Sequence, residues 1–262
     1  MEPKSLPRRA VVGVIGLVGA VVVADLAHSG FGVLHRDQTA PTDTDDDRSD
    51  DPVGVAELAP GETVSLPGTV TDGDVSVERA LENRRSRREF GDEPLETEQL
   101  SQLLWAAQGI TDARGYRTAP SAGAQYPLEL YVVIGQPGVE GLDPGVYRYL
   151  PDEHRLEFHK PGSVQAELRS AAADQRPVET AAIDVVICAV DERTTDRYGQ
   201  RGKQRYVPME AGHVGQNLYL QTETLDLATV AIGAFSDGAV REVIGASEDE
   251  RPLYVFPIGM RV

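Results

Sequence analysis

Apolar residues recur at helix or strand spacing along the chain from about Asp74 onward. Residues 97–108 predict the clearest helix, because four apolar residues fall on one face and Gly109 follows as a stop signal. A run over residues 182–190, apolar except for Asp184, predicts a strand buried on both faces. Further helices are predicted over residues 76–83, 163–173, 208–222 and 240–244, and further strands over residues 128–134, 145–150, 155–158, 228–232 and 253–258. This order predicts the α+β class, with helices packed on a central sheet.

The first 30 residues have the pattern of an export signal or a membrane anchor. Lys4, Arg8 and Arg9 precede an apolar run over residues 10–24, which is short for a membrane span and typical of a signal. The arginine pair resembles a twin-arginine export signal. Because the positive charges precede the apolar run, the rest of the chain is expected outside the membrane. The competing interpretation is a cytoplasmic protein with an apolar N-terminus.

Residues 31–73 are predicted to form an acidic, disordered linker and an irregular lead-in. A run rich in threonine and aspartate over residues 37–51 contains almost nothing apolar, so it cannot bury enough surface to fold. Prolines and glycines over residues 60–68 favour irregular structure after it. The folded domain is therefore expected to cover residues 74–262.

The chain is strongly acidic. It has 25 lysines and arginines against 42 aspartates and glutamates among 262 residues, a formal net charge of −17. This charge argues against general binding of nucleic acid, whose phosphates favour a basic surface. Dense carboxylates with few lysines are typical of proteins adapted to high salt. The single cysteine, Cys188, excludes an intramolecular disulfide and a cysteine-based metal site, and its apolar surroundings predict a buried, inert thiol.

Residues 84–90 stand against this acidic background. Arg84, Arg85, Arg87 and Arg88 place four guanidinium groups within five positions, with Ser86 between them. Such a cluster favours an anion, and the planar fork of arginine suits phosphate. A solvated basic run and a nucleic-acid patch are the alternatives.

Three further segments are candidates for ligand contact. Small residues at 120–125 lead into a strand, and Ser121 and Gln125 can bond the edge of a flat ligand. Residues 232–235 lie at the end of a predicted strand. On the long helix, Gly212 and Gly215 call for a reason such as close packing, and His213 is expected to be a hydrogen-bonded structural residue rather than a base.

In combination these segments carry a resemblance. Arg-Arg-Ser-x-Arg-x-Phe after a first helix, Pro-Ser-x-Gly before a strand, and Glu-x-Gly-His-x-x-Gln-Asn on a long helix resemble the nitroreductase superfamily of FMN flavoproteins. The SagB-type branch, whose members form thiazoles and oxazoles, is the most similar, and the resemblance covers residues 76–262. It implies a central, mostly antiparallel sheet flanked by helices, and a homodimer with FMN at the subunit interface.

The resemblance also implies roles for individual residues. The phosphate, the ribityl chain and the pyrimidine edge of FMN would be held by Arg84, Arg85, Ser86 and Arg88. The ring would be lined from the partner subunit by Pro120, Ser121, Ala122 and Gln125. The flavin near N5 would face the backbone of Gly233 and Ala234. Many relatives also have a basic phosphate contact near the C-terminus, where this chain has Arg261. A cation near N1 would stabilise reduced, anionic flavin.

One departure from the branch concerns the catalytic residues. Azoline oxidases of this branch use a Lys-Tyr pair ahead of the long helix, and the nearest match here is Arg197-Tyr198. Tyr198 is therefore the candidate acid or base, but arginine does not deprotonate to act as a base. This difference argues against azoline oxidation itself.

Three functions fit these observations. The first is an FMN-dependent oxidoreductase of SagB type that passes a hydride between flavin and a small or peptidic substrate. The second is a nitro or quinone reductase fed by NAD(P)H, against which an outer location counts. The third is a flavin-free binding partner that kept the fold. No Gly-x-Gly-x-x-Gly follows a strand, so nothing predicts a separate dinucleotide-binding domain.

Overall fold

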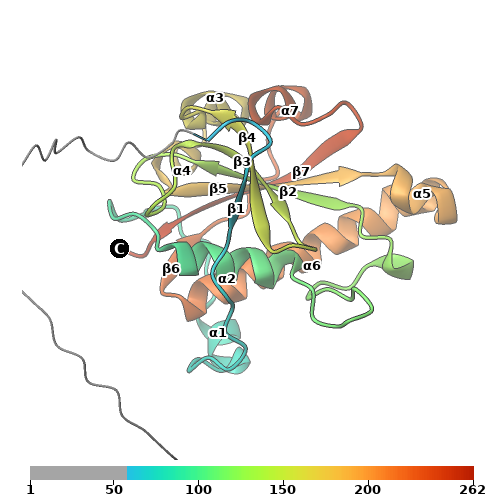
Figure 1. The fold of residues 1–262 in the computed structure, drawn as a ribbon, viewed down its shortest axis with the longest axis horizontal. Helices are drawn as coiled ribbons and strands as arrows, with labels where there is room; N and C mark the ends of the chain where they lie inside the picture. Colours follow the sequence, from blue (N-terminus) through green and yellow to red (C-terminus); the bar gives the residue numbers. More distant parts are fainter. Residues whose placement is uncertain (1–57) are drawn as a thin grey trace, which may run out of the picture. The chain divides into compact units, whose positions relative to one another are not determined.

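Seven strands form one sheet in the computed structural model, which describes residues 58–262 (Figure 1). Across the sheet the strands follow the order β1 (Thr63–Ser65), β4 (Arg155–Pro161), β3 (Gly145–Leu150), β2 (Leu128–Ile134), β5 (Ile183–Val190), β7 (Glu250–Met260) and β6 (Leu227–Thr229). Every neighbouring pair runs antiparallel. The predicted α+β class and the mostly antiparallel sheet are therefore confirmed.

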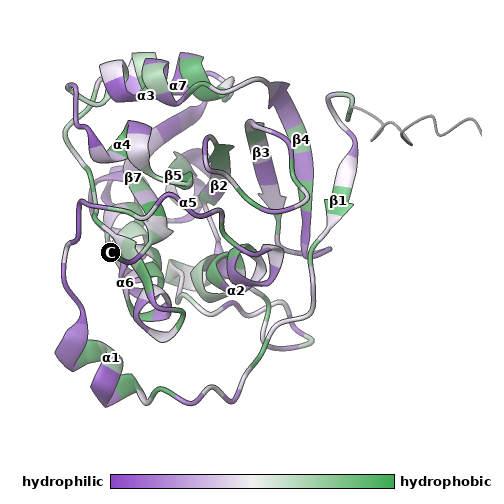
Figure 2. Ribbon diagram, turned by 90° about the vertical axis from the view of Figure 1, so that its left-hand side faces the viewer, coloured by the Kyte–Doolittle hydropathy of each residue, from purple (hydrophilic) through white to green (hydrophobic). Residues whose placement is uncertain are grey.

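Helices cover both faces of the sheet (Figures 1 and 2). α2 (Thr97–Gln108) and α6 (Val207–Thr224) pack on one face, and α3 (Gln165–Ala171), α4 (Pro177–Thr180) and α7 (Asp237–Ile244) pack on the other. Because side chains alternate along a strand, β2 serves both layers. Leu128 and Leu130 belong to the core under α2 and α6, whereas Tyr131 and Val133 belong to the core under α3 and α7.

β5 is the central buried strand that the apolar run predicts. All of its residues except the last are buried. Cys188 lies within it, fully buried, and burial raises the pKa of its thiol, as expected of an inert cysteine.

The two glycines of α6 have different surroundings. A Cβ at Gly215 would lie 2.7 Å from Cζ of Phe256 on β7, so this glycine lets the helix approach the sheet closely. Gly212 is exposed, and a Cβ there would have no neighbour within 4 Å. Close packing within the described chain therefore explains Gly215 alone.

The first helix confirms its predicted cap but not its predicted buried stripe. α1 spans Val77–Asn83, and the Ser76 hydroxyl accepts a hydrogen bond from the Arg79 N–H at 3.2 Å. Ala80 is buried, whereas Val77 and Leu81 are 63% and 52% exposed. The stripe was wrong for these two side chains, because α1 lies away from the sheet (Figure 2) and Ala80 is its one buried residue.

The lead-in to the fold also differs from the prediction. Residues 58–73 are not irregular throughout, because β1 pairs with β4 and Leu66 joins the core. Ser101 on α2 donates a hydrogen bond to the Pro67 carbonyl at 2.6 Å, and Gln102 bonds the backbone of Val70 at both its N–H and its carbonyl. The packed chain therefore begins before the expected start at Asp74. The predicted signal at 1–30 and the predicted linker at 31–57 lie outside the described residues.

Two helical segments between β5 and α6 were not predicted. α5 spans Glu192–Tyr198, and a π-helical turn over Gly202–Tyr206 runs directly into α6. Both segments are rich in charged residues, so they lack the apolar periodicity on which a helix prediction depends. Within the described part of the chain, no helix is both long enough and apolar enough to cross a membrane.

Candidate functional site

The loop at residues 84–90, here called the arginine loop, follows α1 and runs beside the ends of β6 and β7. The Arg87 N–H donates to the Thr229 carbonyl at 2.9 Å, and the Gly91 N–H donates to the Met260 carbonyl at 2.9 Å. Phe90 forms a bridge with Arg261, and a Cβ at Gly259 would lie 2.8 Å from Cβ of Phe90. The loop is therefore held against the C-terminal strand.

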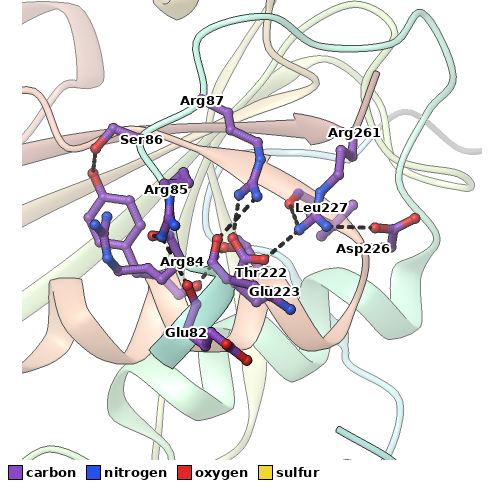
Figure 3. A network of polar contacts seen from close by, with 12 residues as sticks. Glu82, Arg84, Arg85, Ser86, Arg87, Thr222, Glu223, Asp226, Leu227 and Arg261 are labelled. Carbon is purple, nitrogen blue, oxygen red and sulfur yellow. Dashed lines mark hydrogen bonds and ion pairs between the residues drawn. The ribbon is translucent and has the colours of Figure 1, made fainter. Parts of the chain in front are cut away.

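A buried carboxylate separates the basic residues of this region into two groups (Figure 3). The Glu223 side chain, only 3% exposed, pairs with Arg87 through one oxygen and with Arg261 through the other, the latter at 2.9 Å. Arg261 also pairs with Asp226 at 3.0 Å. Arg84, Arg85 and Arg88 form no ion pair with another described residue. These three guanidiniums are the ones that an anion would meet without competition from a carboxylate.

Tyr219 on α6 joins the arginine loop to the segment 231–234 that follows β6. Its hydroxyl lies 2.8 Å from the Ser86 hydroxyl and accepts a hydrogen bond from the Ala231 N–H at 2.8 Å. The Arg84 guanidinium lies 5.0 Å from the centre of the Tyr219 ring. The structure thus joins the loop at 84–88 to Ala231, two residues before Gly233, and we treat residues 84–88 and 231–234 as one half of the candidate site.

The second half of the candidate site surrounds residues 120–125, which contain the short helix η1 (Ala122–Ala124). Gly123 has a φ of +63°, and a Cβ there would lie 2.5 Å from the Tyr198 hydroxyl and 3.3 Å from Nη1 of Arg197. A glycine is therefore required for this contact. The predicted acid or base, Tyr198, lies directly against the loop that was predicted to line a ring.

The other predicted residues of this loop are held by local contacts. The Ser121 hydroxyl accepts from the Tyr126 N–H at 2.9 Å, and the Gln125 amide donates to the Gly123 carbonyl at 2.8 Å. Pro120 is exposed and Ala122 is half-buried. The Tyr198 ring packs edge-on against Tyr206 of the π-helical turn, with ring centres 5.1 Å apart.

Glu210 on α6 lies beneath this loop. It is the first residue of the Glu-x-Gly-His segment, but the sequence assigned it no role of its own. Its side chain is buried beside the Ser121 hydroxyl, the Arg117 guanidinium and the Gln108 amide. Its Oε1 and the Gln108 Nε2 make no hydrogen bond with another described residue. Burial raises the pKa of Glu210 to about 7, against the lowering effects of Ser121, Arg117 and Gln108. The carboxyl is therefore poised to hold a proton near neutral pH.

His213 occupies a different environment from the one expected. It is exposed on α6, beside exposed Gly212, and makes no hydrogen bond with another described residue. The expectation of a hydrogen-bonded structural histidine was wrong within this chain, because the outward face of α6 at this position has no element packed on it. No group of three or more histidine, cysteine, aspartate or glutamate side chains among residues 58–262 could hold a metal ion.

The two halves are separate within one chain. Both depend on α6, with Glu210 under the second half and Tyr219 and Glu223 under the first. At a rise of 1.5 Å per residue, positions 210 and 223 lie about 20 Å apart along the helix axis. Across the described residues, no hydrogen bond, ion pair or aromatic contact joins residues 84–88 or 231–234 to residues 120–125 or Tyr198.

Comparison with known proteins identifies relatives over most of the described chain. Residues 81–260 match the model of the nitroreductase family. The protein MJ1384 of Methanocaldococcus jannaschii, named as a nitroreductase, is 44% identical over 189 residues, which are 72% of this chain and 93% of that protein. The trifolitoxin operon protein TfxC of Rhizobium leguminosarum is 26% identical over 68% of this chain, which spans 54% of the length of TfxC.

Solved structures share the fold. A structure from Anabaena variabilis, named as a nitroreductase, has a TM-score of 0.68 at 27% identity, covering 77% of this chain but 42% of its own. A chain of the Escherichia coli microcin synthetase McbBCD, solved as a complex with truncated pro-MccB17 bound, has a TM-score of 0.59 at 26% identity and covers 76% of this chain.

The buried pairing of Glu223 leads to a stability prediction. We expect Glu223→Ala to lower the free energy of unfolding by about 2–4 kcal/mol, because Arg87 and Arg261 would lose the buried carboxylate that neutralises them. Urea denaturation measures the change. Asp226→Ala is the matched control, because this carboxylate is 82% exposed and pairs with Arg261 alone. Equal losses in the two variants would contradict the central role of Glu223.

The raised pKa of Glu210 leads to a pH prediction. The folded state holds the Glu210 proton more tightly than the unfolded state. The protonated carboxyl therefore contributes its full stabilisation below about pH 4.5, the ordinary pKa, and this contribution is lost as the pH rises through the raised pKa of about 7. Glu210→Gln should remove this loss, so its stability relative to wild type should rise by up to about 3 kcal/mol between pH 4.5 and 8. Denaturation at several pH values tests this, with Glu167→Gln on the exposed surface of α3 as control. Parallel profiles for wild type and Glu210→Gln would rule it out.

Proposed function

The chain belongs to the nitroreductase family, and on this premise we propose that it is an FMN-dependent oxidoreductase of the SagB-type branch. The likeness to TfxC and to the McbBCD chain supports the branch. The proposed reaction is transfer of a hydride between flavin and a small or peptidic substrate. When bound, FMN supplies the two-electron chemistry, so no protein nucleophile is required.

The observation that carries the proposal is that some arginines of this region are paired with carboxylates and others are not. In a chain of net charge −17, three guanidiniums lie on one loop with no carboxylate partner among the described residues. A doubly charged phosphate matches this donor set, because arginine binds phosphate through charge-assisted, bidentate bonds. We assign Arg84, Arg85, Ser86 and Arg88 to the phosphate and the ribityl chain. Arg261 would contribute only while also paired with Glu223 and Asp226.

The ring of the cofactor would meet residues from two places. Gly233 and Ala234 follow Ala231, which Tyr219 joins to the arginine loop, and their backbone groups would approach the flavin near N5. Pro120, Ser121, Ala122 and Gln125, together with Tyr198, belong to the other half of the site. Tyr198 would hold or move a proton at its hydroxyl, which lies against Gly123.

We further propose that two copies of the chain complete each site. The two halves do not meet within one chain, and both lie along α6. The outward face of α6 carries exposed Gly212 and His213, and Met209 is 49% exposed on it. Such an open face with a small residue favours close packing against another helix. A homodimer would place the loop at 120–125 of one copy beside the arginine loop of the other.

The substrate follows from the relatives by analogy. TfxC is named for a trifolitoxin operon, and the McbBCD structure has a truncated precursor bound, which supports a peptidic substrate for this chain. The 44% identity with a protein named as a nitroreductase supports the second candidate, a nitro or quinone reductase that takes electrons from NAD(P)H. Rapid anaerobic bleaching of bound flavin by NADH or NADPH would favour this second candidate.

The proposal also covers the location of the protein and its adaptation to salt. Export by a twin-arginine-like signal, or anchoring on the outer face of the membrane, is proposed from residues 1–30. Adaptation to high salt is proposed from the acidic composition, so activity should be measured in concentrated salt.

The cofactor assignment has a direct test. The purified protein in high salt should show a flavin spectrum with one FMN per chain, and the double variant Arg84→Ala, Arg88→Ala should bind FMN at least about 100-fold more weakly, because it loses two charge-assisted contacts. Absorption spectroscopy and titration with FMN measure this. The control is Arg79→Ala, which removes an exposed arginine from α1, one turn before the loop. Unchanged flavin content in the double variant would overturn the phosphate assignment.

A further inference from the structure

We propose that Tyr219 is a positioning residue that aims the Ser86 hydroxyl at the bound anion. The inference rests on the proposed function, because it assigns the anion as the phosphate of FMN. Tyr219 carries no motif of its own and lies two residues beyond Asn217 on α6. Two of its contacts reach Ser86 and Arg84, which were assigned to the cofactor independently of it, and a third reaches Ala231, two residues before Gly233.

The direction of the hydrogen bonds follows from the donors available. The Ala231 backbone offers only an N–H here, so the Tyr219 oxygen accepts this bond, at 2.8 Å. The tyrosine proton is then free to point at Ser86, whose oxygen lies 2.8 Å away. In the arrangement that we propose, Ser86 accepts that proton and directs its own proton elsewhere. Ser86 is exposed, so the direction left for its proton is outward from the loop.

A chain of bonds in one direction strengthens its last donor. Each hydroxyl that accepts a hydrogen bond becomes a better donor in the next one. The order Ala231 N–H, Tyr219 O–H, Ser86 O–H therefore ends in a polarised donor on a loop with three guanidiniums. A polarised hydroxyl donor beside three guanidiniums favours binding of an anion.

The Tyr219 ring has a second positioning effect, on Arg84. The Arg84 guanidinium lies 5.0 Å from the ring centre, a distance typical of a cation–π contact. The ring is itself fixed edge-on against Phe256, with centres 5.7 Å apart. Phe256 is buried and also contacts α6 at Gly215. A rigid support therefore lies behind both Ser86 and Arg84.

Tyr219 also links the arginine loop to the segment 231–234. The Ala231 N–H lies two residues before Gly233, the residue proposed to approach the flavin near N5. Because Tyr219 bonds both Ala231 and Ser86, the position of the phosphate and the position of the ring segment are set by the same hydroxyl. Loss of the hydroxyl should therefore weaken the whole contact with FMN rather than the fold.

A double-mutant cycle tests whether Tyr219 acts through Ser86. Tyr219→Phe keeps the ring and the Arg84 contact but removes the hydroxyl. We expect Tyr219→Phe and Ser86→Ala each to weaken FMN binding roughly three- to tenfold, the worth of one hydrogen bond. The double variant should be no weaker than the worse single variant. Fluorescence titration with FMN measures each affinity.

Tyr254→Phe is the matched control. The Tyr254 ring packs on Phe256 with centres 5.4 Å apart, as the Tyr219 ring does at 5.7 Å, but its hydroxyl makes no hydrogen bond with another described residue. This variant should bind FMN like wild type. If Tyr219→Phe also binds like wild type, or if the effects of Tyr219→Phe and Ser86→Ala multiply in the double variant, the inference is wrong.

A second measurement separates this inference from the proposed function. Hydrogen exchange of the Ala231 amide in the cofactor-free protein should be faster in Tyr219→Phe than in Tyr254→Phe, because the acceptor of that amide is gone. Exchange that is equal in the two variants overturns the Tyr219 contact. If wild type takes up no FMN but the exchange differs, the proposed function and the phosphate role fail, while the Tyr219 contact itself stands.

Discussion

The candidate site depends on one buried carboxylate. Glu223 lies in the last turn of α6, and its two oxygens join the arginine loop to the C-terminal strand through Arg87 and Arg261. A carboxylate buried without cations would be strongly unfavourable, so this position requires both guanidiniums. The pairing also decides which arginines can bind a ligand. Glu223 pairs with Arg87 and Arg261, whereas Arg84, Arg85 and Arg88 have no carboxylate partner among the described residues.

The separation of the site into halves follows from the length of α6. Its first turn supports the loop at 120–125 through Glu210, and its last two turns support the arginine loop through Tyr219 and Glu223. A helix is rigid, so Glu210 and Glu223, which support the two halves, stay about 20 Å apart along its axis. A second copy related by a two-fold axis would bring opposite halves together twice, which gives two equivalent sites. The exposed face at Gly212 and His213 lies on the same helix.

Much of the fold could be predicted from the sequence because its elements are periodic. α2 has four apolar residues on one face, and β5 is apolar except for Asp184, so each is specified locally. β1 could not be predicted, because it has three residues and its pairing with β4 is about 90 positions distant. α5 and the π-helical turn consist largely of polar and charged residues, whose helical structure depends on the elements on either side.

The candidate site could likewise be predicted only in part from the sequence. The arginine loop is visible as a cluster of charge, but its separation into paired and unpaired arginines depends on Glu223, which resembles an ordinary polar residue in sequence. Tyr219 belongs to no motif, and the motif that begins at Glu210 does not reveal the role of this carboxyl, because both residues act on segments far away in the chain. Tyr198 lies next to Gly123 although about 75 positions separate the two residues in the chain, so the sequence alone does not show the contact.

The central claim is that two copies share each site, and complementation between two variants tests it most directly. One variant carries Arg84→Ala and Arg88→Ala, and the other carries Gly123→Val, whose side chain would collide with Tyr198. Each variant alone should lack flavin. Co-expressed with different tags and purified as the mixed dimer, they should recover one FMN per dimer, because one site then combines two intact halves. A mixed dimer without flavin, made from variants that fold, would contradict the shared site.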